Sequence, residues 1–115
     1  MQDISTSFRI AVNANKNKII EKLKLNKDIS IIVSEENKLS ISHNNVVINR
    51  NEDYDEVLSR VDEDAYLYYE TNLDFYPKDN IVLIENQIQL AKNILKNLND
   101  AGIPSEIIAE FENLL

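Results

Sequence analysis

Hydrophobic and polar residues alternate at several places in the first half of the chain, a pattern that is typical of half-buried β-strands. It predicts strands at residues 8–12, 29–33, 39–43 and 46–48. Over residues 15–25 the apolar side chains return at helical spacing with lysines around the rest, so we expect an amphipathic helix there. The first half is therefore expected to form one helix and a set of short antiparallel strands.

Asparagine residues are expected to mark the ends of these elements, because their side chains cap helices and their backbone tolerates a positive φ. Asn13 or Asn15 is expected to cap the first helix, and Asn44 and Asn45 are expected to turn the third strand into the fourth. His43 shares the parity of the apolar residues on its strand, so we expect a structural histidine that points towards the core or its edge.

The middle of the chain is expected to pass from a polar segment into a long strand. Within residues 51–63 we expect at least one helical turn over 54–61, with inward side chains at Val57, Leu58 and Val61. Residues 65–76 alternate as a strand does, which predicts two opposite faces. The face towards the core would carry Leu67, Tyr69, Thr71, Leu73 and Phe75. The solvated face would carry Tyr66, Tyr68, Glu70, Asn72, Asp74 and Tyr76.

Residues 82–100 carry the clearest helical spacing, and Asp79 or Asn80 is expected to cap that helix. Gly102 can take the left-handed conformation that ends a helix, and a proline two residues later prevents its continuation. Residues 103–112 fit a strand and a helix almost equally well. We favour a strand that enters a short turn, because a helix that ends in glycine usually returns the chain to its sheet.

This order of elements predicts a single α+β domain over residues 1–115. It is expected to have two layers, with a mostly antiparallel sheet, helices packed on one face and the other face at least partly open.

Charge divides the chain unevenly. The first fifty residues hold eight basic and five acidic side chains, whereas residues 51–80 hold two basic and ten acidic ones together with all five tyrosines. Carboxylates repel phosphate, and tyrosine offers rigid contact area with a polar tip, so such a surface suits a protein partner better than a nucleic acid. The expected partner-binding residues are Glu52, Asp53, Asp55, Glu56, Asp62, Glu63, Asp64, Tyr66, Tyr68, Glu70, Asp74 and Tyr76.

The composition argues against most enzyme chemistry. The chain has no cysteine and one glycine, which excludes thiolate metal sites and glycine-rich phosphate loops. No serine stands in a nucleophile elbow. The acidic runs do not match an EF-hand loop, and the chain is small for a sugar cleft. We therefore expect no catalytic residue, no cofactor and no bound metal.

The chain is also expected to stay away from membranes. Its N-terminus lacks the basic start and apolar segment of a signal peptide, and its basic first helix carries no aromatic anchor. A cytoplasmic protein is the simplest interpretation.

The second half resembles the small immunity proteins of bacterial polymorphic toxin and contact-dependent growth inhibition systems. The similarity lies in the Ala-Tyr-Leu-Tyr-Tyr-Glu segment at 65–70, the amphipathic helix, the Leu-Asn-Asp-Ala-Gly-Ile turn at 98–103 and the Ile-Ile-Ala-Glu-Phe-Glu segment at 107–112. The resemblance implies a stoichiometric inhibitor of a toxin, often a nuclease. It assigns no contact residues.

Two alternatives use the same residues differently. The chain could be a phage-type or anti-defence inhibitor whose acids imitate phosphates, or a small regulatory subunit that self-associates through an exposed sheet face. The gene next to this one would separate the first alternative from a toxin inhibitor, and light scattering would test the second.

Overall fold

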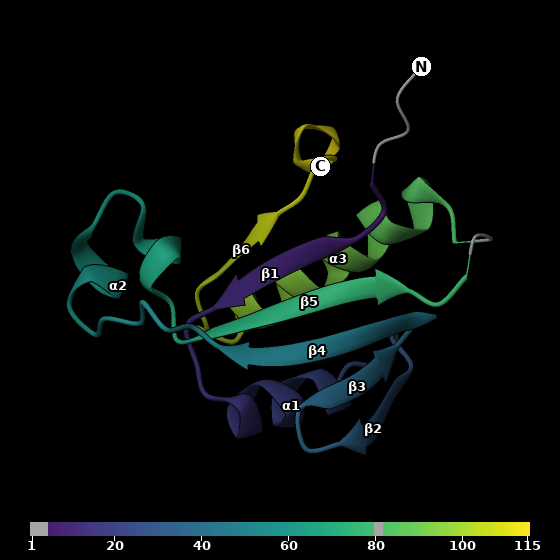
Figure 1. Cartoon of the computed structure of the whole chain (residues 1–115), viewed down its shortest axis with the longest axis horizontal. Coiled ribbons are helices and arrows are strands. Elements are labelled where there is room, and N and C mark those ends of the chain that lie inside the picture. Colours follow the sequence, from purple (N-terminus) through teal and green to yellow (C-terminus); the bar gives the residue numbers. More distant parts are fainter. Residues whose placement is uncertain (1–4, 80–81) are drawn as a thin grey trace.

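Six antiparallel strands and two long helices make up most of the fold. The computed structural model describes residues 5–79 and 82–115. The strands are β1 (Phe8–Val12), β2 (Ile31–Glu35), β3 (Lys38–Ile41), β4 (Asn44–Arg50), β5 (Thr71–Pro77) and β6 (Ser105–Ile108). The helices are α1 (Lys16–Lys24), α2 (Leu58–Val61) and α3 (Ile84–Asp100), with 3₁₀ turns η1 (Ala65–Tyr68) and η2 (Glu112–Leu114). The strands lie in the order β2-β3-β4-β5-β1-β6 (Figure 1).

The sheet is covered on one face. Figure 1 shows α3 crossing behind β1 and β5, and the buried side chains of α1 join the same core as those of α3 and the sheet. No helix of comparable length covers the opposite face of the described strands, which is turned towards the viewer. The expected two-layer α+β fold with a mostly antiparallel sheet is therefore confirmed.

Aromatic stacking fixes the centre of the core. Phe8 and Phe75 are register partners on β1 and β5, and their rings stack with centroids 4.4 Å apart. Phe111, from the segment after β6, meets Phe8 edge-on at 5.6 Å. All three are at most 5% exposed, so the C-terminal segment completes the core.

The C-terminal strand follows from the way α3 ends. Gly102 has a φ of 79°, and the N–H of Ile103 donates to the carbonyl of Leu98 at 2.9 Å. This left-handed turn reverses the chain, and residues 105–108 pair with β1. The strand favoured for this segment is confirmed, and it enters a short 3₁₀ turn as expected.

One of the two predicted helix caps is confirmed and the other is wrong. The side chain of Asn15 accepts from the N–H of Lys18 at 2.9 Å, so this residue caps α1 as one of the two expected candidates. The N-cap of α3 is Leu83, whose N–H donates to the side-chain oxygen of Asn86. The cap expected at Asp79 is therefore wrong, and Asn80 lies outside the described residues.

The hairpin between β3 and β4 turns two residues earlier than expected. Ser42 and His43, with φ of 45° and 68°, form the turn, and His43 is exposed rather than directed at the core. Asn44 instead begins β4 with a fully buried side chain. Its amide exchanges two hydrogen bonds with Gln87 of α3, at 3.1 and 2.8 Å. This long-range pairing fixes the register of the hairpin.

We predict that Asn44→Ala lowers the free energy of unfolding by about 1–3 kcal/mol, because it leaves the buried amide of Gln87 without one of its partners. Asn45→Ala, on the neighbouring exposed residue, is the control and is expected to change it by less than about 0.5 kcal/mol. Urea denaturation of both variants measures the difference, and equal losses would contradict the assigned role of the amide pair.

Candidate functional site

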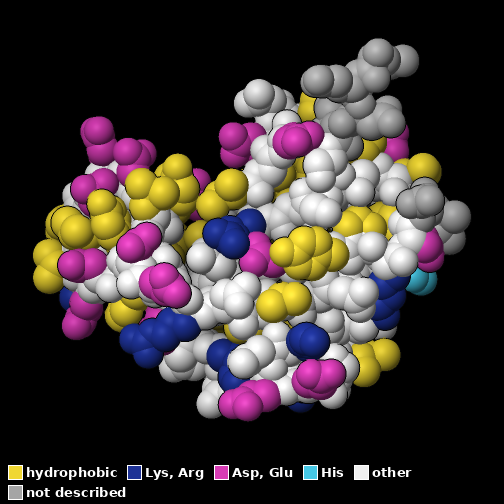
Figure 2. All heavy atoms as spheres, viewed as in Figure 1, with side chains coloured by type: hydrophobic (Ala, Val, Ile, Leu, Met, Phe, Trp, Pro, Cys, Tyr) yellow, Lys and Arg dark blue, Asp and Glu magenta, His cyan; other side chains and the backbone are white. Residues whose placement is uncertain are grey.

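An acidic lobe connects β4 to β5. We use this name for residues 51–70, which hold eight carboxylates and a single arginine. The lobe contains α2 and η1 and projects beyond one end of the sheet (Figure 1). Figure 2 shows acidic and hydrophobic side chains gathered over this part of the molecule.

Asn51 holds the lobe in shape. Its side-chain amide donates to the carbonyls of Leu67 and Tyr69, at 2.9 and 2.8 Å, and its own N–H donates to the carbonyl of Glu70. These bonds curl residues 65–68 into a 3₁₀ turn, and pairing with the sheet begins only at Thr71. The expected strand over 65–70 is therefore wrong, although residues 71–76 are in a strand as predicted.

The tyrosines expected on one strand face are divided between two places. Tyr66 and Tyr68 belong to η1 and are half-buried within the acidic lobe, and Glu70 is half-buried at its end. Tyr76 lies on the open face of β5, where it is 48% exposed. The structure thus brings two of the predicted tyrosines together with the acidic residues and leaves the third apart.

Asp74 is not available to a partner, in contrast to its expected place on a solvated face. Its side chain accepts two hydrogen bonds from the guanidinium of Arg9, at 2.6 and 3.1 Å, and one from the amide of Asn49 at 3.0 Å. The hydrogen bond to Asp74 is the main cause that raises the pKa of Arg9. Asp74 is buried by this cross-strand contact, so its role is to join β1, β4 and β5 on the open face.

Some carboxylates of the acidic lobe shape its backbone. Asp55 accepts from the N–H groups of Val57 and Leu58, both at 2.9 Å, and so begins the turn that leads into α2. Asp62 accepts from the N–H of Asp64, and Glu56 pairs with Arg60 at 3.2 Å. The acidic residues of the lobe that are exposed and carry none of these side-chain contacts are Glu52, Asp53, Glu63 and Asp64.

Three hydrophobic side chains stand exposed among these acids. Val57, Val61 and Leu67 are 62%, 71% and 49% exposed, so the expectation that they point inward is wrong. The short helix instead turns Ser59 inward, where its hydroxyl donates to the carbonyl of Glu56. Apolar spacing in the sequence could not reveal this outward apolar group, because the same spacing is typical of a buried face.

A shallow groove crosses the acidic lobe. It has a volume of about 420 Å³ and is lined by Glu52, Asp53, Tyr54, Asp55, Leu58, Leu67 and Tyr68. The guanidinium of Arg50 lies 5.9 Å from the ring centre of Tyr54, which holds this ring against the end of β4. Tyr54 was missed as a site residue, although it belongs to the same run of acids and tyrosines.

Tyr69 attaches the acidic lobe to the sheet. It is 9% exposed, so it is buried as expected, although it does not join the main cluster of core side chains. Burial raises its pKa above the ordinary 10.0, and the negative charge of Glu106 on β6 raises this pKa further. The side chain therefore sits near the edge strand β6 rather than beneath α3.

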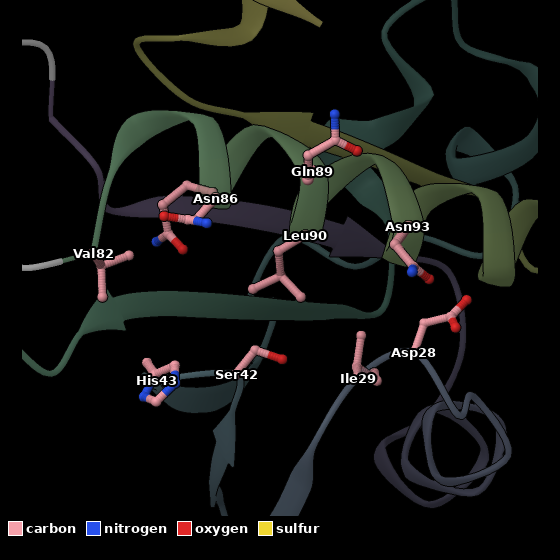
Figure 3. Close-up of a pocket in the computed structure, with 10 residues that line it drawn as sticks. Asp28, Ile29, Ser42, His43, Val82, Asn86, Gln89, Leu90 and Asn93 are labelled. Atoms are coloured by element: carbon pink, nitrogen blue, oxygen red, sulfur yellow. The ribbon is translucent and has the colours of Figure 1, made fainter.

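A second hollow lies on the helical side of the sheet, at the β3–β4 turn (Figure 3). It has a volume of about 440 Å³ between the N-terminal half of α3, the turn at Ser42 and His43, and the segment before β2 at Asp28 and Ile29. The sequence did not indicate this pocket, because the predicted hairpin placed His43 on a strand, with its side chain towards the core or its edge, and not in the turn.

Comparison of the chain with protein-family models, with curated proteins and with solved structures finds no match. Among the described residues, no group of three acidic or histidine side chains is placed to hold a metal ion. No helix of the described segments is long and apolar enough to cross a membrane.

We predict that stability falls as the pH rises above about 10, because the unfolded chain then loses the Tyr69 proton before the folded chain does. Tyr69→Phe should flatten this decline, since it removes the group whose pKa is raised by folding. Tyr76→Phe, which changes an exposed tyrosine, is the control and should leave the slope as it is. Unfolding measured at several alkaline pH values gives the slopes, and identical slopes for all three proteins would contradict the assignment.

Proposed function

We propose that the protein is an immunity protein that binds and neutralises a cognate bacterial toxin through its acidic lobe. The observation that carries this proposal is the exposed group of Val57, Val61 and Leu67 among the carboxylates of the lobe. An apolar centre with a charged rim is the usual construction of a protein–protein interface. The proposed role is that of a binding protein without catalytic activity, and its place of action is the cytoplasm.

The charge of the acidic lobe supports a basic partner. Eight carboxylates and one arginine lie within twenty residues, so the lobe has a formal charge of −7. A toxin that acts on nucleic acid needs a basic cleft to hold phosphate. An acidic inhibitor is attracted to such a cleft over long distances, which raises the rate of encounter. A nuclease-type toxin is therefore the partner that this charge fits best.

The backbone contacts within the acidic lobe support recognition by a preformed surface. Asn51, Asp55 and Asp62 use their side chains to hold the local chain, and no buried polar side-chain atom among the described residues lacks a partner. A surface that is ordered before binding loses less conformational entropy when the partner docks. Tyr54 and Tyr68, which line the groove, can supply rigid aromatic contacts at its centre.

We predict that reversing two exposed charges, Glu63→Lys with Asp64→Lys, slows association with the proposed basic toxin domain by about ten-fold at low salt. The difference should shrink at high salt, because screening removes the long-range attraction. Surface-binding kinetics at several salt concentrations measure both effects. The matched control is Glu85→Lys with Glu112→Lys, two exposed acids outside the lobe. Unchanged association and unchanged protection of growing cells would contradict the proposal.

We predict that Val61→Ser with Leu67→Ser weakens toxin binding by about ten-fold or more, chiefly through faster dissociation, because apolar contacts at the centre of an interface act after encounter. Both side chains are exposed, so the free energy of unfolding should change by less than about 1 kcal/mol. Ile32→Ser on β2, another exposed apolar residue, serves as the control. Loss of affinity in the control alone would place the interface on the edge of the sheet instead.

A further inference from the structure

The pocket of Figure 3 is separate from the acidic lobe. It lies beside the β3–β4 turn and the start of α3, whereas the lobe joins the opposite ends of β4 and β5. Its floor is apolar, formed by Leu90 of α3 and by Ile29, with the polar side chains placed around it (Figure 3). Its volume of about 440 Å³ lies within the range of small-ligand sites.

One end of the pocket offers hydrogen-bond donors. Asn86 uses its side-chain oxygen on the N–H of Leu83, which leaves its NH₂ group for a ligand. Ser42 accepts weakly from the N–H of Ser30 through its hydroxyl oxygen, so its O–H remains a donor, and His43 stands beside it. The positive end of the α3 dipole lies at the same end of the pocket. This end suits a carboxylate or another anionic group.

The other end carries a negative charge. Asp28 faces the pocket next to Asn93 (Figure 3), and it is the one aspartate, glutamate, lysine or arginine among the described residues that line it. The side-chain oxygen of Asn93 accepts from the amide of Asn26 at 2.6 Å, which fixes its orientation. Asp28 also borders an adjoining hollow lined by Lys92 and Lys96, of which Lys96 pairs with Asp100. Among the described residues Asp28 itself forms no ion pair, so its carboxylate can accept from an ammonium group.

The distance between the two ends sets the length of the ligand. Asn86 and Asn93 are seven residues apart on α3, which corresponds to about 10 Å along the helix axis. An extended peptide of three residues spans about the same distance. Leu90 lies between the two asparagines, so the middle of the ligand would rest on an apolar surface.

We propose that this pocket binds a short apolar peptide of about three residues whose two termini are free. The ammonium group pairs with Asp28, the carboxylate receives hydrogen bonds from Ser42 and Asn86, and the central side chain packs on Leu90. The proposal does not depend on the toxin partner.

The surroundings of the pocket are rigid, which favours binding at a fixed geometry. Gln87 lines the pocket from below and is held by Asn44 and by the carbonyl of Thr6 at 2.8 Å. Ser42 and His43 both have positive φ angles, as the two central residues of a two-residue hairpin turn commonly do. The turn that presents both side chains to the pocket is thus fixed by its backbone and by the buried amide pair.

The test is a titration of the full chain with the tripeptide Ala-Leu-Ala, followed by backbone amide chemical shifts in nuclear magnetic resonance. We expect shifts at Ser42, His43, Asn86 and Asn93. N-acetylation of the peptide removes its ammonium group and should weaken binding about ten-fold, and C-amidation should do the same at the opposite end.

Asp28→Asn gives the decisive comparison. Asp28 is exposed, so the variant should fold normally, which amide dispersion in the same spectra verifies. It should bind the free tripeptide about ten-fold more weakly but bind the N-acetylated peptide as the original protein does. Asp53→Asn, in the acidic lobe, makes the same change away from the pocket and should have no effect. Absence of shifts at millimolar peptide, or equal binding of all three peptides, would overturn the proposal.

Discussion

The fold depends on covering one face of an antiparallel sheet with two helices and a single aromatic side chain from the C-terminal segment. The register of β1 against β5 places Phe8 on Phe75, and the return of the chain through β6 brings Phe111 onto the same rings. Burial of these side chains is the largest favourable term in folding. The open face and the acidic lobe lie outside this layer, whereas the pocket beside the β3–β4 turn rests on its core residues Ile29 and Leu90.

The parts of the fold that were predictable are those in which local pattern and tertiary contact agree. In residues 8–12 the alternate apolar side chains Phe8, Ile10 and Val12 are buried in the core. The apolar residues of α3 likewise recur at helical spacing along its buried face, so both elements were predicted. The turn at Gly102 was predicted because glycine adopts the required positive φ without steric cost. In each of these elements, neighbouring residues alone determine the local conformation.

The errors arose where a distant side chain decides the local conformation. Residues 65–70 alternate like a strand, yet the amide of Asn51 binds two of their carbonyls and bends them into a 3₁₀ turn. Asn44 is a good turn residue by propensity, yet the hydrogen bonds of its side chain with Gln87 hold it in the core, and the turn lies at Ser42 and His43.

The sequence therefore predicted the charge of the candidate site but not the conformation of its backbone. Its acids lie together, Asp74 is withdrawn by Arg9, and the exposed valines were unforeseen.

The acidic lobe begins and ends on adjacent strands. Arg50, the last residue of β4, and Thr71, the first residue of β5, are register partners, so the two ends of the lobe are held side by side by the sheet itself. If the residues between them are replaced, the new loop still joins the same two adjacent strand ends. The entropic cost of closing the loop therefore changes little, even when its length changes. A scaffold of this kind can exchange its recognition loop while its hydrophobic layer is conserved, as antibody domains do with theirs. Related chains could therefore diverge in partner much faster than in fold.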